Sequence, residues 1–242
     1  MYSISIIIPA FNEERYIGET LTSLDRAKKF MLKKKHVPIE ILVVDNDSED
    51  LTVNVAKAFG VTIISEIQHN IARVRNTGAN LANGNILIFI DADTIVPENL
   101  LYCVYEAMAD STCLGGAVNT NYRPVKLTTR LYLNIWRIVG HLAGIAQGAT
   151  QFCRRHVFFE LKGYDESLYM GEDVDFYCRL KRFAKQQRAR VRFLEGLEVL
   201  PSTRRFDQCG LWRTLIWTNP IYIQMFRRRK KAWKGWYQNS PR

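Results

Sequence analysis

The chain has 242 residues, five scattered cysteines and a formal net charge of +10, which lies mostly in residues 201–242, where ten Lys and Arg face one acidic residue. This length is enough for one domain with a sizeable core. The cysteines include no C-x-x-C pair, which argues against a disulfide framework and a zinc site and favours a reducing compartment.

We expect no signal peptide, because the chain runs from Met1 straight into a strand pattern. No apolar run approaches the ~18 to 20 residues needed to span a bilayer. Any membrane contact should therefore be peripheral.

The first half of the chain alternates short apolar runs with helical patterns. The runs predict buried strands at residues 3–8, 39–44, 61–64 and 86–90, and Pro9 should end the first because proline cannot donate to a strand ladder. Helical spacing follows each of the first three, and the third helix, 69–82, closes at Asn83-Gly84. This rhythm predicts an α/β fold with a mainly parallel sheet and right-handed crossovers.

Polar segments follow three of these strands, at Pro9–Glu13, Asp45–Asp50 and Asp91–Asp93. Ligands of open α/β sheets bind beyond the carboxyl ends of the strands, so the three segments should converge at one edge. Two carboxylates at this spacing suit Mg²⁺ or Mn²⁺, and either cation suits a diphosphate. Taken alone, an aspartate after a strand is more commonly a turn or cap residue.

The second half is less regular. A strand is expected at 113–119, and an amphipathic helix at 127–145, which fits packing on the sheet better than a partner surface. Residues 162–166 form a turn, and Gly171–Asp175 open a helix that continues to Phe183. Acidic residues in that first turn are favoured by the helix dipole, so on their own they would be read as caps.

Five segments in order carry a resemblance to a known family: IIIPAFNEE (6–14), ILVVDNDSED (41–50), ARVRNTGANLANG (72–84), ILIFIDAD (86–93) and GYDESLYMGEDVDFYCRLKR (163–182). Together they resemble the family 2 glycosyltransferases of GT-A fold. The resemblance implies a GT-A, Rossmann-like three-layer α/β domain over residues 1–205. Its nucleotide-binding half would cover about 1–110 and its acceptor half 111–205, leaving 206–242 as a basic aromatic tail.

The resemblance also implies an activity, namely inverting transfer of a sugar from a nucleotide-diphospho-sugar to an acceptor hydroxyl or phosphate with Mn²⁺ or Mg²⁺. It assigns the following residues to donor binding: Pro9, Ala10, Phe11, Glu13, Asp45, Asn46, Arg75, Asn76 and Asp91. Asp93 and Asp91 match the metal ligands, and Asp173 matches the general base. Gln151, Arg154, Glu172 and Arg204 match positions that contact the acceptor or donor sugar.

Two positions depart from the family pattern. Many members have Asp-Asp where this chain has Asp45-Asn46, which leaves the choice of base open. Some relatives place a metal-binding histidine in the loop that corresponds to residues 201–205, and this chain has none there. A third protein ligand for the metal is therefore not assigned.

The tail interleaves aromatic and cationic side chains from residue 211 to 237. This pattern fits contact with a membrane surface, and it fits equally a packed C-terminal helix with a solvated basic end. Nucleic acid is disfavoured because the body of the chain has no basic surplus. We expect a cytoplasmic protein, with peripheral attachment to the inner face of the cell membrane and a polyprenyl-lipid-linked acceptor as open options.

Two rival functions remain at this point. A nucleotidyltransferase uses a similar sheet, but normally shows a Gly-rich loop with Lys or Arg after the first strand, which PAFNEE is not. A non-catalytic, membrane-recruited scaffold of the same fold is the second rival.

Overall fold

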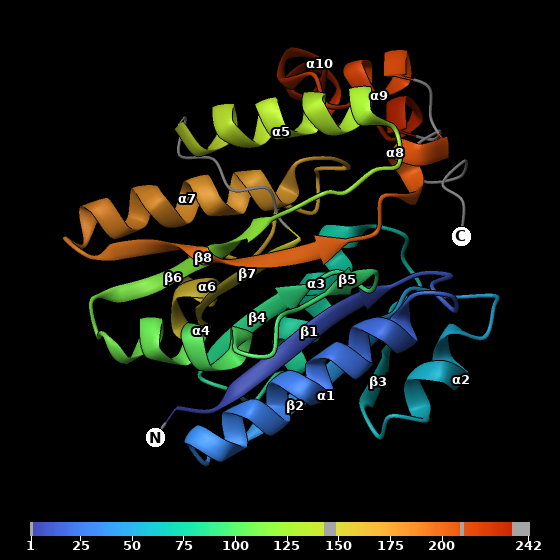
Figure 1. Ribbon diagram of the computed structural model, residues 1–242. Helices are drawn as coiled ribbons and strands as arrows, with labels where there is room; N and C mark the ends of the chain where they lie inside the picture. Colours follow the sequence, from blue (N-terminus) through green and yellow to red (C-terminus); the bar gives the residue numbers. More distant parts are fainter. Residues whose placement is uncertain (1, 143–148, 209–210, 234–242) are drawn as a thin grey trace.

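The apolar runs of the first half form the centre of a mixed sheet (Figure 1). The computed structural model describes residues 2–142, 149–208 and 211–233. Its strands are β1 (Ile4–Ala10), β2 (Ile39–Asp45), β3 (Thr62–Ser65), β4 (Ile86–Ile90), β5 (Thr94–Ile95), β6 (Cys113–Thr120), β7 (Thr150–Arg154) and β8 (Arg190–Pro201). Its helices are α1 (Ile17–Lys34), α2 (Thr52–Lys57), α3 (Ile71–Leu81), α4 (Leu100–Ala109), α5 (Leu127–Leu142), α6 (Arg155–Glu160), α7 (Glu172–Gln186), α8 (Arg204–Gln208), α9 (Leu211–Trp217) and α10 (Pro220–Phe226), followed by a 3₁₀ turn at Lys230–Trp233.

The strand order is β3-β2-β1-β4-β7-β6-β8-β5. Strands β3, β2, β1 and β4 are parallel neighbours, as predicted. Strand β7 runs antiparallel to both β4 and β6, which makes β6 parallel to β4 across it. The carboxyl ends of β1, β2, β4 and β6 therefore reach the same edge of the sheet.

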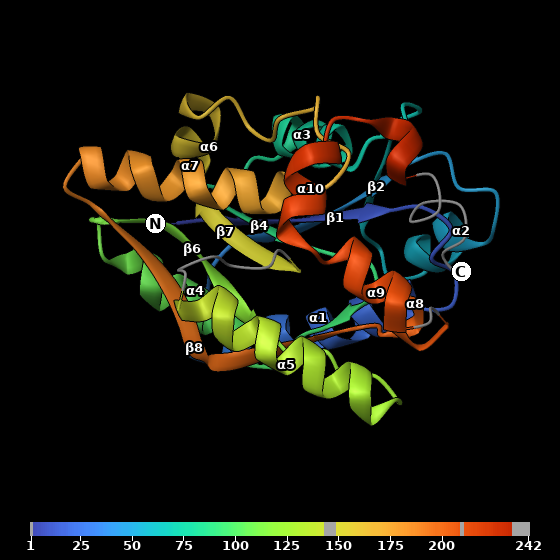
Figure 2. The ribbon, with the colours of Figure 1, turned by 90° about the horizontal axis from the view of Figure 1, so that it is seen from above.

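Helices cover both faces of the sheet, which Figure 2 shows edge-on between its two helical layers. On one face, α1 and α4 pack against alternate residues of β1 and β4, such as Ile6 and Ile88. On the other face, α3, α6 and α7 pack against the residues between them, such as Ile7 and Phe89. Both faces of β1 and β4 are buried, which explains their unbroken apolar runs.

The end of β1 and three of the strands differ from the sequence-based prediction. Strand β1 does not end at Pro9, because its pairing with β2 continues to Ala10 opposite Asp45. The pairing of β1 with β4 stops at Ile7. Pro9, which has no backbone N–H to donate, therefore lies beyond the part of β1 that pairs with β4. Strands β5, β7 and β8 were not predicted at all, although β7 is central.

The described part of the tail contacts the rest of the fold. The predicted boundary at 205/206 falls inside α8. Trp233 is fully buried and donates its indole N–H to the Phe226 carbonyl, while the Tyr169 amide donates to the Arg227 carbonyl. None of the helices in the described residues is long and apolar enough to cross a bilayer.

Candidate active site

The loops after β1 and β2 are joined by hydrogen bonds between backbone amides and side chains. The amides of Asn12 and Glu13 donate to Ser48 Oγ and Thr52 Oγ1 at 2.9 and 2.7 Å. The Glu14 amide donates to Asp50 Oδ2 at 3.1 Å. The predicted convergence of these two strand ends is therefore present, and the polar residues of 45–52 serve largely to hold the first loop in place.

Residues predicted to bind the nucleoside line this junction. Pro9 and Ala10 are buried opposite Val44 and Asp45. The Asn46 side chain donates to the carbonyls of Glu66 and Gln68, so it fixes the loop after β3. Within the described chain, buried Asp45 Oδ1 has no hydrogen-bond partner. Phe11 stacks at a tilt on the ring of His69, with centroids 4.8 Å apart. An unpartnered buried acceptor beside two rings fits recognition of a base.

Arg75 connects the end of β4 to the start of α7. Its guanidinium, which is 3% exposed, donates to Asp91 Oδ1 at 2.7 Å and to Glu172 Oε1 at 2.6 Å. Burial acts to lower the pKa of Arg75, but the two carboxylates raise it above its ordinary value. Burial and neighbouring Asp173 raise the pKa of Glu172 to about 7, against the opposing charge of Arg75.

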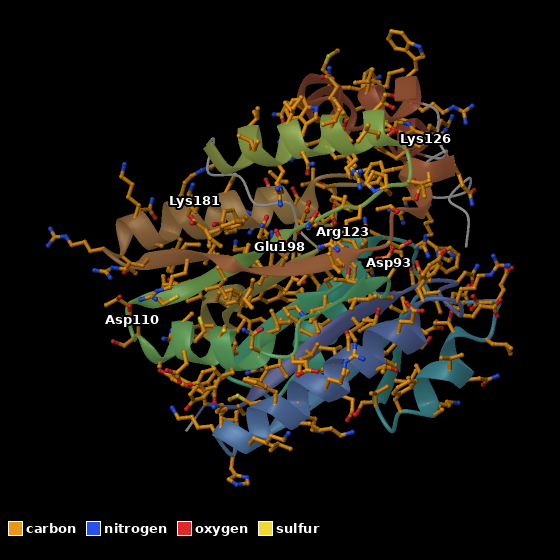
Figure 3. The ribbon with its side chains drawn as sticks, in the orientation of Figure 1. Asp93, Asp110, Arg123, Lys126, Lys181 and Glu198 are labelled. Carbon is orange, nitrogen blue, oxygen red and sulfur yellow. The ribbon has the colours of Figure 1, made fainter. Side chains whose placement is uncertain are left out.

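Arg204 makes a second bridge, from α8 back to the first loop. It forms a bidentate ion pair with Glu13, lies 3.5 Å from Asp93 Oδ2 and stacks 4.4 Å from the ring centre of Tyr16. Burial and the charge of Glu13 raise the pKa of Asp93 to about 7, while Arg204 opposes the shift. Figure 3 marks Asp93 at the edge of the sheet where the chain leaves β4.

Asp173 lies in the first turn of α7, half-exposed and within the electrostatic reach of Arg75. Gln151 of β7 holds its backbone, because the side-chain amide donates to the Asp173 carbonyl at 3.0 Å. Gln151 itself accepts a hydrogen bond from the Tyr164 hydroxyl at 3.3 Å. Gln151 is therefore a support beneath Asp173 and is only 2% exposed.

Tyr122 was missed by the sequence analysis. Burial raises its pKa well above the ordinary range, and the nearby charges of Asp91, Asp93 and Asp173 raise it further. The side chain packs edge-on against Phe206 of α8. The signal that could have found it is its position two residues after β6, at the edge where the other strand-end loops meet.

Two predicted contacts are not brought to this site. Arg154 lies opposite Ile86, at the far end of β4, where it donates to the carbonyls of Cys113, Met108 and Asp110. Because β7 runs antiparallel to β4, it carries Arg154 away from Asp91, so the structure does not bring this residue to the predicted sugar contact. The Asn76 amide is committed to the turn after α6, with hydrogen bonds to Tyr164 and Glu166.

The carboxylates after β4 fit a divalent cation. The Arg204 guanidinium is paired with Glu13 and lies 3.5 Å from Asp93 Oδ2, so both carboxylates point toward the same position. Among the described residues, no group of three His, Cys, Asp or Glu side chains is arranged as a complete metal cage. Mg²⁺ and Mn²⁺ are commonly held by one or two carboxylates together with substrate phosphates, so Asp91 and Asp93 would suffice as protein ligands if a cation binds here.

Solved structures resemble this arrangement over most of the chain. The mannosyltransferase PcManGT from Pyrobaculum calidifontis, in complex with GDP-Man and Mn²⁺, superposes with a TM-score of 0.68 at 20% identity, covering 96% of this chain and 64% of that one. Glucosyl-3-phosphoglycerate synthase of Mycobacterium tuberculosis, with Mn²⁺ and UDP-glucose, gives 0.61 at 19%, covering 94% and 79%. These likenesses confirm the predicted GT-A fold.

Curated relatives are similar over shorter stretches. The chain is 31% identical over 152 residues to the 4,4'-diaponeurosporenoate glycosyltransferase of Staphylococcus aureus, covering 57% of this chain and 37% of that protein. It is 26% identical over 113 residues to glycosyltransferase GlyG of Streptococcus pneumoniae, covering 44% and 35%. The chain thus spans about a third of the length of these relatives.

The family model described as Glycosyl transferase family 2 matches residues 5–160. That range contains the strand-end loops after β1, β2 and β4, which hold residues predicted to bind the donor. Because the match extends over well more than half of the 242 residues and agrees with the fold, the chain belongs to glycosyl transferase family 2.

Proposed function

We propose that this protein transfers a sugar from a nucleotide-diphospho-sugar to a hydroxyl or phosphate acceptor, with inversion at the sugar carbon and with Mn²⁺ or Mg²⁺. One observation carries the proposal. Arg75 and Arg204 hold Asp91, Asp93, Glu13 and Glu172 around one strand-end edge, so acids from three separate segments (the loop after β1, the loop after β4 and the start of α7) face a shared site.

The donor half supplies recognition of the nucleotide. Asp45 and the paired rings of Phe11 and His69 would contact the base and ribose. Asp91 and Asp93 would hold the cation beside the diphosphate. When bound, that cation supplies positive charge against the negative charge that develops on the leaving phosphate.

The acceptor half supplies the base. A hydroxyl is a poor nucleophile at neutral pH, so a carboxylate must take its proton as the new bond forms. Asp173 suits this role because it is half-exposed at the rim, whereas Glu172 beside it is buried and bound to Arg75. Gln151 would fix the position of Asp173 through its backbone.

The proposed stereochemistry follows from the use of a single base. Direct displacement by the acceptor inverts the anomeric carbon and needs one carboxylate. Retention by double displacement would require a second, nucleophilic carboxylate close to that carbon. Glu172 is poorly placed for such attack, since the residue is 6% exposed and Arg75 donates to its Oε1 at 2.6 Å.

We further propose that the acceptor is lipid-linked and reached at the cytoplasmic face of a membrane. Support comes from the tail, where α10 and the residues after it pack beside the loop that leads to Asp173. The Tyr169 amide donates to the Arg227 carbonyl at 2.7 Å, and Arg227 lies 3.8 Å from Asp175. A membrane-facing tail would thus adjoin the acceptor side of the site.

The test is release of nucleoside diphosphate from a panel of nucleotide sugars, with Mn²⁺, with Mg²⁺ and with chelator. We expect one donor to be turned over, and chelator to abolish the turnover. Asp93→Ala should lower turnover by roughly 10²–10³-fold, the loss typical of a removed electrostatic partner. Asp25→Ala, which changes a surface carboxylate on α1, is the matched control and should leave turnover unchanged.

Full activity of Asp93→Ala would contradict the proposed metal site. Transfer of a nucleotidyl group, detected as pyrophosphate release, would favour the nucleotidyltransferase reading. Absence of turnover with every donor, together with retained donor binding, would favour a non-catalytic scaffold. Thermal shift of the protein with each donor and Mn²⁺ reports that binding separately and also identifies the base.

A further inference from the structure

Helix α5 has an apolar stripe on its exposed side. Leu127, Leu131, Ile135 and Ile138 repeat at spacings of four and three residues, so they share one face of the helix. Each is between 56% and 61% exposed. The opposite face packs inward through Thr129 and Leu133. This is the reverse of the usual surface helix, whose solvent face is polar.

The stripe continues onto the neighbouring tail helices. Trp212 and Ile216, one turn apart on α9, are 79% and 48% exposed, and Met225 on α10 is 66% exposed. Helices α5 and α9 are in contact, and the Tyr132 hydroxyl and Thr218 Oγ1 are 2.6 Å apart. Figure 1 shows α5, α9 and α10 together at the top of the molecule, and Figure 2 looks down onto this side.

Positive charge surrounds these apolar residues. Residues 121–142 contain four Lys and Arg and no acidic residue, and the described residues 211–233 contain six and again none. The acid that contacts α5 from β8, Glu198, is paired with Arg137 at 3.3 Å. Lys126 lies at the start of α5 (Figure 3). An apolar face with a basic rim is complementary to a partner that has an apolar interior beneath a layer of anionic groups.

We infer that the outer faces of α5 and α9, with Met225 of α10, form a docking surface for an anionic lipid bilayer. Amphipathic helices of this composition lie in the plane of the lipid interface with the apolar side inserted. Sixteen residues of α5 give a contact line of about 24 Å, since a helix rises about 1.5 Å per residue. The inference refines the proposed membrane contact. That proposal relied on the tail alone, whereas here α5 makes the main contact with the bilayer and the tail helices add to it.

The charge distribution disfavours a second copy of this chain as the occupant. A symmetric dimer places the same patch on both subunits, so the basic rims of α5 would face each other. Like charges across an interface oppose association. An anionic bilayer gains from the same rim, with roughly 1 kcal/mol for each cation near its surface.

Docking on this face would bring the acceptor side of the site to the lipid. The segment that follows α9 passes through α10, and Ile223 of α10 lies against Gly171, next to the acidic turn with Asp173. This consequence rests on the proposed transfer to a lipid-linked acceptor. The docking itself does not, and it is measured without any substrate.

The experiment is flotation of the whole chain with vesicles of phosphatidylcholine containing phosphatidylglycerol, compared with vesicles of phosphatidylcholine alone. We expect the unmodified protein to float with the anionic vesicles. Leu131→Glu/Ile135→Glu should weaken binding at least about tenfold, because it places charge where the stripe enters the lipid. Leu131→Ser/Ile135→Ser, which removes apolar surface without adding charge, should give a smaller loss.

Leu32→Glu/Leu81→Glu is the matched control, since these residues are also exposed leucines on helices, α1 and α3, of the donor half. It should bind as the unmodified protein does. Equal binding by all variants, or no binding by the unmodified protein, would overturn the inference. A dimer in light scattering that Leu131→Glu/Ile135→Glu converts to a monomer would instead assign the face to a second copy.

Release of nucleoside diphosphate into water, measured without vesicles, keeps this test separate from the proposed function. We expect the same rate in the unmodified protein and in every variant of α5, because the stripe lies outside the donor site. Lost flotation with retained turnover confirms the docking surface. Retained flotation of the unmodified protein without any turnover would contradict the proposed function and leave the docking surface in place.

Discussion

The predicted donor half (about residues 1–110) and the predicted acceptor half of the sheet are stabilised in different ways. In the donor half, β1 and β4 are buried runs of apolar residues, and the loops after β1 and β2 are bound to each other. In the acceptor half, central strand β7 carries the polar side chains Gln151 and Arg154 into the interior, and α5 exposes leucine and isoleucine. The first half is therefore stabilised mainly by apolar packing and by hydrogen bonds between neighbouring loops. The second half depends more on hydrogen bonds of buried polar side chains, and it leaves apolar side chains exposed.

The largest expected effect of a substitution is the loss of transfer activity in Asp173→Asn, which tests whether the acceptor half supplies the base. Asp173→Asn keeps the shape but removes the base, so transfer should fall by roughly 10²–10⁴-fold. Donor binding, measured by thermal shift with nucleotide sugar and Mn²⁺, should be retained because the donor half is unchanged. Loss of donor binding would show that Asp173 acts as a structural cap of α7.

Arg75 forms ion pairs with residues of both halves, so its removal should lower the free energy of unfolding as well as the catalytic rate. Arg75→Met leaves Glu172 buried without its cation, a loss of about 3–5 kcal/mol in the free energy of unfolding. Without Arg75 the folded pKa of Glu172 should rise further above about 7. When the pKa of a carboxyl group is higher in the folded than in the unfolded state, the folded protein is most stable below the unfolded-state pKa. The free energy of unfolding then falls as the pH rises toward and through the folded-state pKa.

The variant should therefore lose more stability than the unmodified protein between pH 5.5 and pH 8.5, as followed by denaturant unfolding. Arg75→Met/Glu172→Gln is the control, because it removes both members of the pair and should abolish the extra pH dependence. An equal pH profile in Arg75→Met and the double variant would contradict this account of the pair.

Glycines in the two halves give a smaller effect. A β-carbon on Gly78 of α3 would lie 2.5 Å from Ile7 Cγ2 and 2.8 Å from Val44 Cγ2. Gly78→Ala should cost about 1–3 kcal/mol by overpacking, which exceeds the ~1 kcal/mol that alanine gains in a helix. Gly196→Ala in β8 meets nothing within 4 Å and should be close to neutral. Equal melting temperatures for both variants would break the contrast.

The smallest effect is expected at Tyr122. Its raised pKa keeps the phenol protonated beside Asp91, Asp93 and Asp173, so the hydroxyl is a neutral donor in an acidic site. Tyr122→Phe should remove about one hydrogen bond, ~0.5–1.5 kcal/mol, and lower kcat/KM by less than about tenfold. Tyr122→Leu, which also removes the ring packed on Phe206, should lower the melting temperature as well. An unchanged kcat/KM in Tyr122→Phe would place the hydroxyl outside the site.

The sequence was most informative where local pattern and burial agree. The apolar runs of β1, β2 and β4 could be predicted because both faces of each are buried in the parallel part of the sheet. Strand β7 could not, because TQFCR shows no such run, and its Gln151 and Arg154 side chains donate to distant partners, the Asp173 and Cys113 carbonyls. Strand β8 is similarly hidden by its exposed charged residues and by Gly196.

The candidate site shows the same division. The acids after β1, β2 and β4 could be placed together because parallel strands end at one edge. The ion pairs of Arg75 with Glu172 and of Arg204 with Glu13 could not, since they join residues 97 and 191 positions apart. Arg154 was misplaced for a related reason, because the direction of β7 decides which edge it reaches.

The pairing of Glu13 with Arg204 also fixes when the site is completed during synthesis. Domains generally fold from the N-terminus as the chain is made, at about 5–20 residues per second. The strands β1 to β4 can assemble while α8 is still untranslated, but Glu13 and Asp93 then lie beside each other without their cation. The proposed donor site is therefore complete only when residue 204 has left the ribosome.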